Sequence, residues 1–378
     1  MVFDYATLKL LWWFIILALF IVFCMLGGRD FGVSILLPWV SDSDDERRVV
    51  INSIGSTWEA NQVWFITFAA AIFAAWPIVY ATSFTALYAA LFLVLFTLII
   101  RPPGIEYRSK LPSKAWRQTW DCALFLSGIV PALILGVALG NIFLGLPFHF
   151  DDNLMPHYEG GFIQLLNPFS ILFGLASISI LAFHGSIFLQ KKLPAEYGER
   201  LKKFHILFGW GFIVLFVLIG MWIVWGVNGY HIDAMLDVNH AMNPPQKQVS
   251  VVLQGWLSNY HQYPALWVLP VVTVLAVILA MIAALNVAST LAWLLSALSL
   301  VAALLTASAA LFPFILPSLT HPQHSITLWD GTSSHRTLQY MFWAVVIFLP
   351  LIVAYSSWVF SVLSGKLNKE DLKRVESY

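Results

Sequence analysis

The sequence carries little charge and few cysteines. Only 11% of its 378 residues are charged, less than half the roughly 25% usual in soluble domains. Lysine plus arginine equals aspartate plus glutamate at 20 each, so no net basic field indicates a nucleic-acid partner. The two cysteines, Cys24 and Cys122, provide neither a CxxC pair nor a disulfide framework. The composition therefore excludes an ordinary soluble domain and a disulfide-rich secreted protein.

Apolar residues dominate instead. They make up 60% of the chain, the mean hydropathy is +0.80, and apolar runs of 18 or more residues recur along its length. The runs do not alternate polar with apolar, as the strands of a membrane β-barrel do. The sequence predicts an all-α integral membrane protein with one transmembrane domain over residues 1–378. Because the first run is long and no cleavage pattern follows it, we interpret it as a span and not as a signal peptide.

The apolar runs predict about nine transmembrane helices. They are expected near residues 8–28, 57–75, 79–100, 119–145, 164–190, 206–228, 263–285, 290–312 and 338–363.

Lysine and arginine predict the orientation of these helices. They concentrate in the loops near 101–118 and 191–205 and in the C-terminal tail, and are scarce in the loops at 146–163, 229–262 and 313–337. The tail residues are Lys366, Lys369, Lys373 and Arg374. The positive-inside rule puts the basic group in the cytoplasm, the N-terminus on the periplasmic side and the C-terminus inside.

Glu59 is a carboxylate about one turn inside the second predicted span. Asn52, Ser56 and Glu59 follow one another at i, i+4 and i+7, which predicts a polar stripe on one helix face. An ionisable residue in a span usually faces a partner or water and often lies on a proton path. The alternative is an interfacial carboxylate paired with an arginine.

Further ionisable residues are expected on the same, cytoplasmic side. Arg29 and Asp30 end the first predicted span, Arg101 ends the third with Glu106 after it, and Asp121 begins the fourth. Carboxylates held ionised by nearby arginines suit proton entry. A structural layer of ion pairs explains the same residues.

His184 is the one histidine deep in a predicted span, and it is a weak candidate for cofactor binding. Imidazole can ligate haem or a metal, but a lone histidine more often packs through hydrogen bonds. No HxxH or ExxH spacing predicts a metal site. No phosphate loop or nucleophile elbow predicts a catalytic residue in this chain.

Several longer motifs carry a family resemblance. They include Trp58-Glu59-Ala60-Asn61-Gln62-Val63-Trp64, Arg101-Pro102 with Tyr107-Arg108-Ser109-Lys110, Leu166-Asn167-Pro168-Phe169, and Ser325-Ile326-Thr327-Leu328-Trp329-Asp330. Over essentially its whole length the chain resembles subunit II of the cytochrome bd-type quinol oxidases of bacterial inner membranes.

The resemblance implies a heterodimer that oxidises quinol and reduces O2 to water in the aerobic respiratory chain. Subunit I would hold two b haems and one d haem and form the quinol site. Small accessory subunits and membrane lipid are further possible partners. Protons would come from the cytoplasm along a path that this subunit helps to build, with the family's W-[DE]-G-N-Q carboxylate at Glu59, its R-P arginine at Arg101 and the following acid at Glu106.

The chain departs from the family pattern at three places. The usual D-G-F-D reads Gly27-Gly28-Arg29-Asp30, Ala60 replaces a glycine, and His335-Arg336 stand where the family is commonly uncharged. The first departure puts a proton role for the missing aspartate in doubt. A different class of function, a secondary transporter coupled to protons through Glu59, would predict repeated halves and broken helices near mid-membrane, which the sequence does not show.

Overall fold

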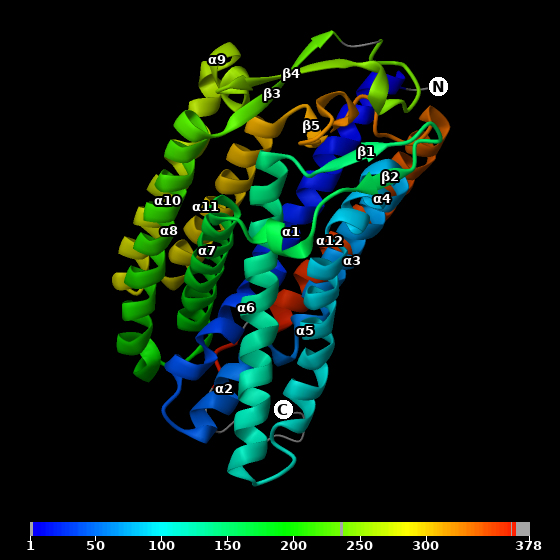
Figure 1. Cartoon of the computed structure of the whole chain (residues 1–378). Coiled ribbons are helices and arrows are strands. Elements are labelled where there is room, and N and C mark those ends of the chain that lie inside the picture. The colour runs from blue at the N-terminus through cyan, green and yellow to red at the C-terminus, as the bar shows by residue number, and fades with distance from the viewer. Residues whose placement is uncertain (1–2, 235–236, 364, 368–378) are drawn as a thin grey trace.

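The computed structural model describes residues 3–234, 237–363 and 365–367, and it shows a bundle of long helices (Figure 1). The helices that form its body are α1 (Tyr5–Val40), α3 (Trp58–Ala75), α4 (Pro77–Ala86), α5 (Tyr88–Tyr107), α6 (Lys114–Leu144), α7 (Pro168–Lys192), α8 (Gly198–Gly226), α10 (Val268–Leu285), α11 (Ser289–Leu311) and α12 (His335–Val362). Shorter helices are α2 (Asp44–Gly55), α9 (Ser258–Gln262) and six 3-10 turns, η1 (Phe162–Leu166), η2 (Ala195–Tyr197), η3 (Pro244–Gln246), η4 (Gly255–Leu257), η5 (Pro264–Trp267) and η6 (Pro322–His324).

Six short strands pair into three antiparallel ribbons. They are β1 (Phe148–Phe150) with β2 (Pro156–Tyr158), β3 (Asn228–Ala234) with β4 (Gln248–Leu253), and β5 (Phe314–Leu316) with β6 (Ile326–Thr327). Figure 1 shows the strands towards one end of the bundle and α2 with the α5–α6 turn towards the other. The loops poor in lysine and arginine are thus separated from the basic loop after α5.

The predicted membrane class is confirmed. Within the described residues, eight helices are long and apolar enough to cross a membrane. Helix α3 is not among them, because Glu59, Asn61 and Gln62 make its first turns polar. The predicted span at 79–100 is divided between α4 and α5 at Leu87. A ninth span and the orientation stay predictions, and Lys369, Lys373 and Arg374 lie outside the described residues.

Helix α1 continues beyond the predicted end of the first span at residue 28. It has 36 residues and ends at Val40, so it is about 54 Å long at the rise of an α-helix. Arg29 and Asp30 do not end the helix, because their opposite charges pair and neighbouring helices bury both side chains. Helix α5 likewise continues beyond the third predicted span, past Arg101 to Tyr107.

The predicted continuous polar stripe is also interrupted. Ser43 caps α2 by accepting a hydrogen bond from the backbone of Glu46. Helix α2 then ends at Gly55, and α3 begins at Trp58 after a turn at Ser56 and Thr57. Asn52 and Ser56 therefore do not share a helix with Glu59.

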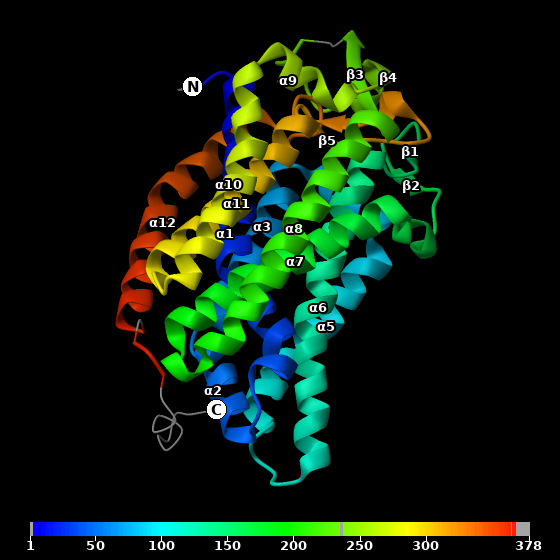
Figure 2. The same cartoon turned by 90° about the vertical axis from the view of Figure 1, so that its left-hand side faces the viewer.

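Helix α1 crosses α7 at a close backbone contact. A Cβ atom at Gly32 would lie 2.0 Å from the backbone oxygen of Leu181, and one at Gly185 would lie 2.7 Å from Cα of Gly32. Small residues allow such an approach between membrane helices. This crossing holds residues 29 and 30 inside the bundle, whereas α12 runs along its outer edge (Figure 2) and buries only Leu338.

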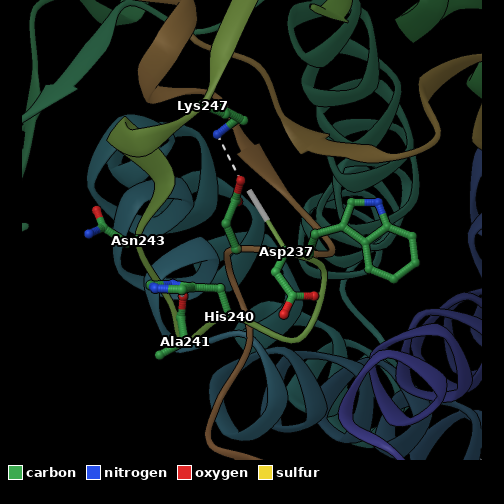
Figure 3. Close-up of a pocket in the computed structure, with 7 residues that line it drawn as sticks. Asp237, His240, Ala241, Asn243 and Lys247 are labelled. Atoms are coloured by element: carbon green, nitrogen blue, oxygen red, sulfur yellow. Dashed lines mark hydrogen bonds and ion pairs between the residues drawn. The ribbon is translucent and has the colours of Figure 1, made fainter. Parts of the chain in front are cut away.

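Two buried lysines hold together the end of the bundle that carries the strands. Lys9 donates to the backbone oxygens of Val238 and His240, each at 2.9 Å. Lys247 Nζ lies 2.9 Å from a carboxylate oxygen of Asp330, in a small polar pocket (Figure 3). Burial lowers the pKa of Lys247, and the carboxylate opposes part of that shift. Asp330 also accepts from the backbone of Thr327, so the pair fixes β4 to the loop before α12.

Replacing Lys247 with methionine is expected to destabilise the protein by about 3 kcal/mol, because the Asp330 carboxylate, only 14% exposed, loses the cation that pairs with it. Thermal unfolding of the purified protein measures this. Lys202→Met is the control: its partner Glu199 is 85% exposed, and the expected loss is below about 1 kcal/mol. Equal unfolding temperatures for both variants would contradict a structural role of the buried pair.

Candidate functional site

Asp30 is the buried centre of the predicted proton path. Its side chain is 1% exposed and points from α1 towards α3. Asn61 Nδ2 donates to Asp30 Oδ2 at 2.7 Å, and Arg29 Nε lies 3.6 Å from Asp30 Oδ1. A buried charge requires a counter-charge and hydrogen bonds. Asp30 has both.

The Arg29 guanidinium lies among aromatic rings. Its Cζ atom is 4.6 Å from the ring centre of Phe188 and 5.1 Å from that of Phe360, and Nη2 donates to Thr57 Oγ1 at 3.5 Å. Aromatic faces attract a cation without supplying a negative charge. Asp30 is therefore the carboxylate that balances Arg29.

Arg101 provides a second buried cation. It is 1% exposed, and its guanidinium donates to the backbone oxygen of Ser127 at 2.7 Å and to Ser127 Oγ at 3.3 Å. Its Cζ atom lies 4.8 Å from the ring centre of Phe31. Its charge also attracts the Asp30 carboxylate. Asp30 therefore has one arginine, Arg29, as its neighbouring cation and a second buried cation, Arg101, in the same part of the bundle.

Two buried oxygens in this cluster have unused acceptor capacity. Neither Asp30 Oδ1 nor Asn61 Oδ1 accepts a hydrogen bond from the residues that the structure describes. Buried polar atoms are normally satisfied by protein or by water. Both atoms can accept a hydrogen bond from water, and the Asp30 carboxylate can also take up a proton.

The other predicted path residues lie further out. Asn52 is half-buried, while Ser56, Glu59 and Glu106 are exposed on this chain. Over the described residues, no cationic nitrogen lies within 4.0 Å of the Glu59 carboxylate. The alternative of a Glu59–Arg101 ion pair is therefore absent from the described geometry. The predicted cluster divides into a buried part around Asp30 and an exposed part around Glu59.

A separate ion-pair network joins α2, α5 and α6. Arg108 Nε lies 2.5 Å from Asp121 Oδ1, and Arg108 Nη2 lies 2.8 Å from Asp44 Oδ1. Arg47 also reaches Asp121, at 2.9 Å. Here the structural interpretation of the charged residues is supported, because every one of these charges has a partner.

His184 does not fit a haem ligand in this structure. It is fully buried, its Nδ1 lies 2.8 Å from Ser296 Oγ, and its Nε2 lies 3.0 Å from the backbone oxygen of Met25. An axial ligand must present a free nitrogen to iron. Both nitrogens are already in hydrogen bonds, which favours the packing role.

Sequence reasoning named Asn61 only as a nearby polar group and missed Ser127 and Thr57. The structure places all three against the buried arginines or Asp30. The available signal was a polar residue inside an apolar run, as at Ser127 in α6. It could not show which neighbour the side chain meets, because helix rotation is set by packing.

Comparison with known proteins identifies the family. Residues 8–363 match the family described as cytochrome bd terminal oxidase subunit II. The chain is 39% identical over 371 residues to cytochrome bd-I ubiquinol oxidase subunit 2 of Escherichia coli strain K12, covering 98% of both chains. It is 40% identical over 367 residues to the probable cytochrome oxidase subunit 2 of Haemophilus influenzae, covering 97% of this chain and 96% of that one.

A solved structure shares the fold. A chain of the bd oxidase from Geobacillus thermodenitrificans superimposes with a TM-score of 0.67 at 13% identity, over 94% of this chain and 98% of that chain. The helical bundle, the near-complete sequence match and the shared fold agree, and the chain belongs to the cytochrome bd terminal oxidase subunit II family.

Proposed function

We propose that this chain conducts protons from the end of the bundle that carries α2 to a haem-carrying subunit I. The chain is a multi-pass inner-membrane subunit of a bacterial cytochrome bd oxidase, an oxidoreductase of the respiratory chain. Haem and quinol use follow from the family. In the proposal, subunit I holds the b and d haems and the quinol site, and bound haem there reduces O2. This chain supplies no haem ligand.

The observation that carries the proposal is the arrangement of Glu59 and Asn61 on α3. The two residues are two positions apart, so they face different directions on the helix. Asn61 is buried and donates to Asp30, whereas Glu59 is exposed. Helix α3 therefore connects the buried carboxylate to an exposed one within its first turn, and this exposed carboxylate is where we place proton transfer to the partner.

The surroundings of Glu59 support a protein partner on this face. Val63 and Ile66, which follow Glu59 at i+4 and i+7 on α3, are 55% and 62% exposed. An ionisable side chain on a lipid-facing membrane helix is costly. Subunit I covering this face would shield Glu59 from lipid. Accessory subunits and lipid would then cover other apolar faces, such as that of α12.

The transporter alternative is not favoured. The family match covers nearly the whole chain and names a terminal oxidase subunit. The break between α4 and α5 is a broken helix of the kind that transporters use, but the ionisable residues lie elsewhere.

Glu59→Gln should lower quinol oxidase turnover about tenfold while haem content stays normal. Glutamine keeps the size of the side chain but removes the titrating proton, and a positioned acid–base group contributes at least this much. The measurement is O2 consumption at saturating quinol, normalised to haem d, between about pH 6 and 8.

Two control variants accompany the glutamine variant. Glu59→Asp should retain most of the rate, since it keeps a carboxylate. Glu199→Gln removes an exposed carboxylate on α8 and should leave turnover unchanged. If Glu59→Gln matches the wild type over this pH range, the relay through Glu59 is wrong.

A further inference from the structure

Three potential metal ligands meet among the strands. They are His149 on β1, Glu159 directly after β2, and His321 between β5 and η6. One ligand atom from each lies within 4.8 Å of the other two. None of these residues belongs to the proposed proton path. Chain spacing could not reveal the group, because His321 lies in a different loop from the other two.

Backbone pairing fixes the two segments that carry these ligands. In the β1–β2 ribbon His149 pairs with His157, and the Glu159 backbone nitrogen donates to Pro147 at 2.9 Å. The second segment is attached where the Leu319 backbone nitrogen donates to the oxygen of Leu146 at 2.9 Å. The ligands are thus presented by paired backbone and not by a free loop.

The side chains are oriented for coordination. His149 Nδ1 lies 2.7 Å from Glu159 Oε1, and both side chains are 34% exposed. Thr320 Oγ1 lies 3.2 Å from His321 Nδ1, which leaves Nε2 of His321 for a metal. The His157 ring stacks on His149 with centroids 5.3 Å apart and restricts its rotation.

His324 is a neighbour of this group and not one of its ligands. Its Nδ1 accepts a hydrogen bond from the Phe150 backbone at 2.8 Å, so the neutral ring carries its proton on Nε2. Its ring centroid lies 5.3 Å from that of His321. It therefore packs against the site and leaves three protein ligands.

We propose that His149, Glu159 and His321 bind one divalent transition-metal ion, with zinc as the reference ion. Two imidazoles and one carboxylate, with water as the fourth ligand, form a common tetrahedral zinc set. At bond lengths of about 2.0–2.2 Å, ligand atoms are about 3.3 Å apart, so Glu159 moves slightly away from His149. The neutral His149 ring would bind the ion through Nδ1 and carry its proton on Nε2, so the Nδ1 contact with Glu159 is exchanged for the metal bond. Imidazole ligands favour Zn²⁺, Cu²⁺ and Ni²⁺ over Mg²⁺ and Ca²⁺.

The test is equilibrium dialysis of the purified, chelator-treated oxidase complex against Zn²⁺, with bound zinc measured per haem. The zinc bound by each variant is compared with that bound by the wild type, which distinguishes this site from any other zinc site in the complex. His149→Ala, His321→Ala and Glu159→Gln should each weaken one site by at least about tenfold. Excess Mg²⁺ or Ca²⁺ should not displace that zinc.

His261→Ala is the matched control, because His261 is an exposed histidine on α9 outside the group. It should bind zinc as the wild type does. The proposal is overturned if all four variants bind as much zinc as the wild type with the same affinity, or if only His261→Ala loses zinc. The dialysis measures the amount of bound zinc and its affinity directly, so the result does not depend on the proton path.

Discussion

Arg108→Met is expected to destabilise the oxidase complex by about 3–5 kcal/mol. The Arg108 side chain is 1% exposed and holds Asp121 through Nε at 2.5 Å and Nη2 at 3.2 Å. The same guanidinium contacts Asp44 on α2. Without it, Asp121 keeps only Arg47, and the residue that ends α5 no longer joins Asp44 on α2 to Asp121 on α6.

The control is Arg117→Met in the same network. Arg117 pairs with the Asp44 carboxylate and donates to the backbone oxygen of Leu111 at 3.1 Å, and the side chains of Arg117 and Asp44 are 30% and 39% exposed. Exposed pairs contribute about 1 kcal/mol or less. The half-life of haem-containing complex at a fixed elevated temperature measures both variants, since unfolding of a membrane complex is commonly irreversible. Equal half-lives would show that burial of Arg108 adds nothing.

Arg108 also shows how far sequence reasoning reached. The distribution of lysine and arginine located the basic loop after α5. Which arginine is buried did not follow from the pattern. Arg108 is 1% exposed and Lys110 is exposed, although both lie in the same motif. That difference depends on where α2 packs, which is a long-range contact.

The membrane helices were predictable because lipid requires long apolar runs. The ends of these helices were harder to predict. Arg29 and Asp30 lie inside α1 and do not mark its end. Because the two charges pair, both can be buried within the bundle. Ser56 and Thr57 interrupt what appeared to be one polar stripe. The side-chain pattern there fits a helix, and only the turn in the backbone separates the two segments.

The sequence named candidate residues for the site but did not show how they are arranged. Glu59, Arg101 and Asp30 were named from position and resemblance, and the structure buries both Arg101 and Asp30 inside the bundle. It leaves Glu59 outside. The contact between Asn61 and Asp30 could be predicted only if the rotation of α3 about its axis were known. No local sequence pattern shows that rotation.

Asp30→Asn is expected to destabilise the complex by about 3–5 kcal/mol, because it leaves Arg29 buried without its carboxylate. The change keeps the size of the side chain, so the loss reports charge and not packing. The thermal half-life of the complex and the amount of haem recovered measure the effect. A half-life equal to that of the wild type would show that neither arginine depends on Asp30.

Combining Asp30→Asn with Arg29→Met separates the structural role from proton transfer. The double variant restores the original net charge of the cluster, and methionine can still contact Phe188 and Phe360. Stability should return to within about 1 kcal/mol of the wild type, as expected for two interacting sites. If Asp30 carries protons, turnover per haem d stays low in this stable double variant. Recovery of both stability and turnover would instead make Asp30 only the counter-charge of Arg29, and the proton path would have to reach Glu59 without it.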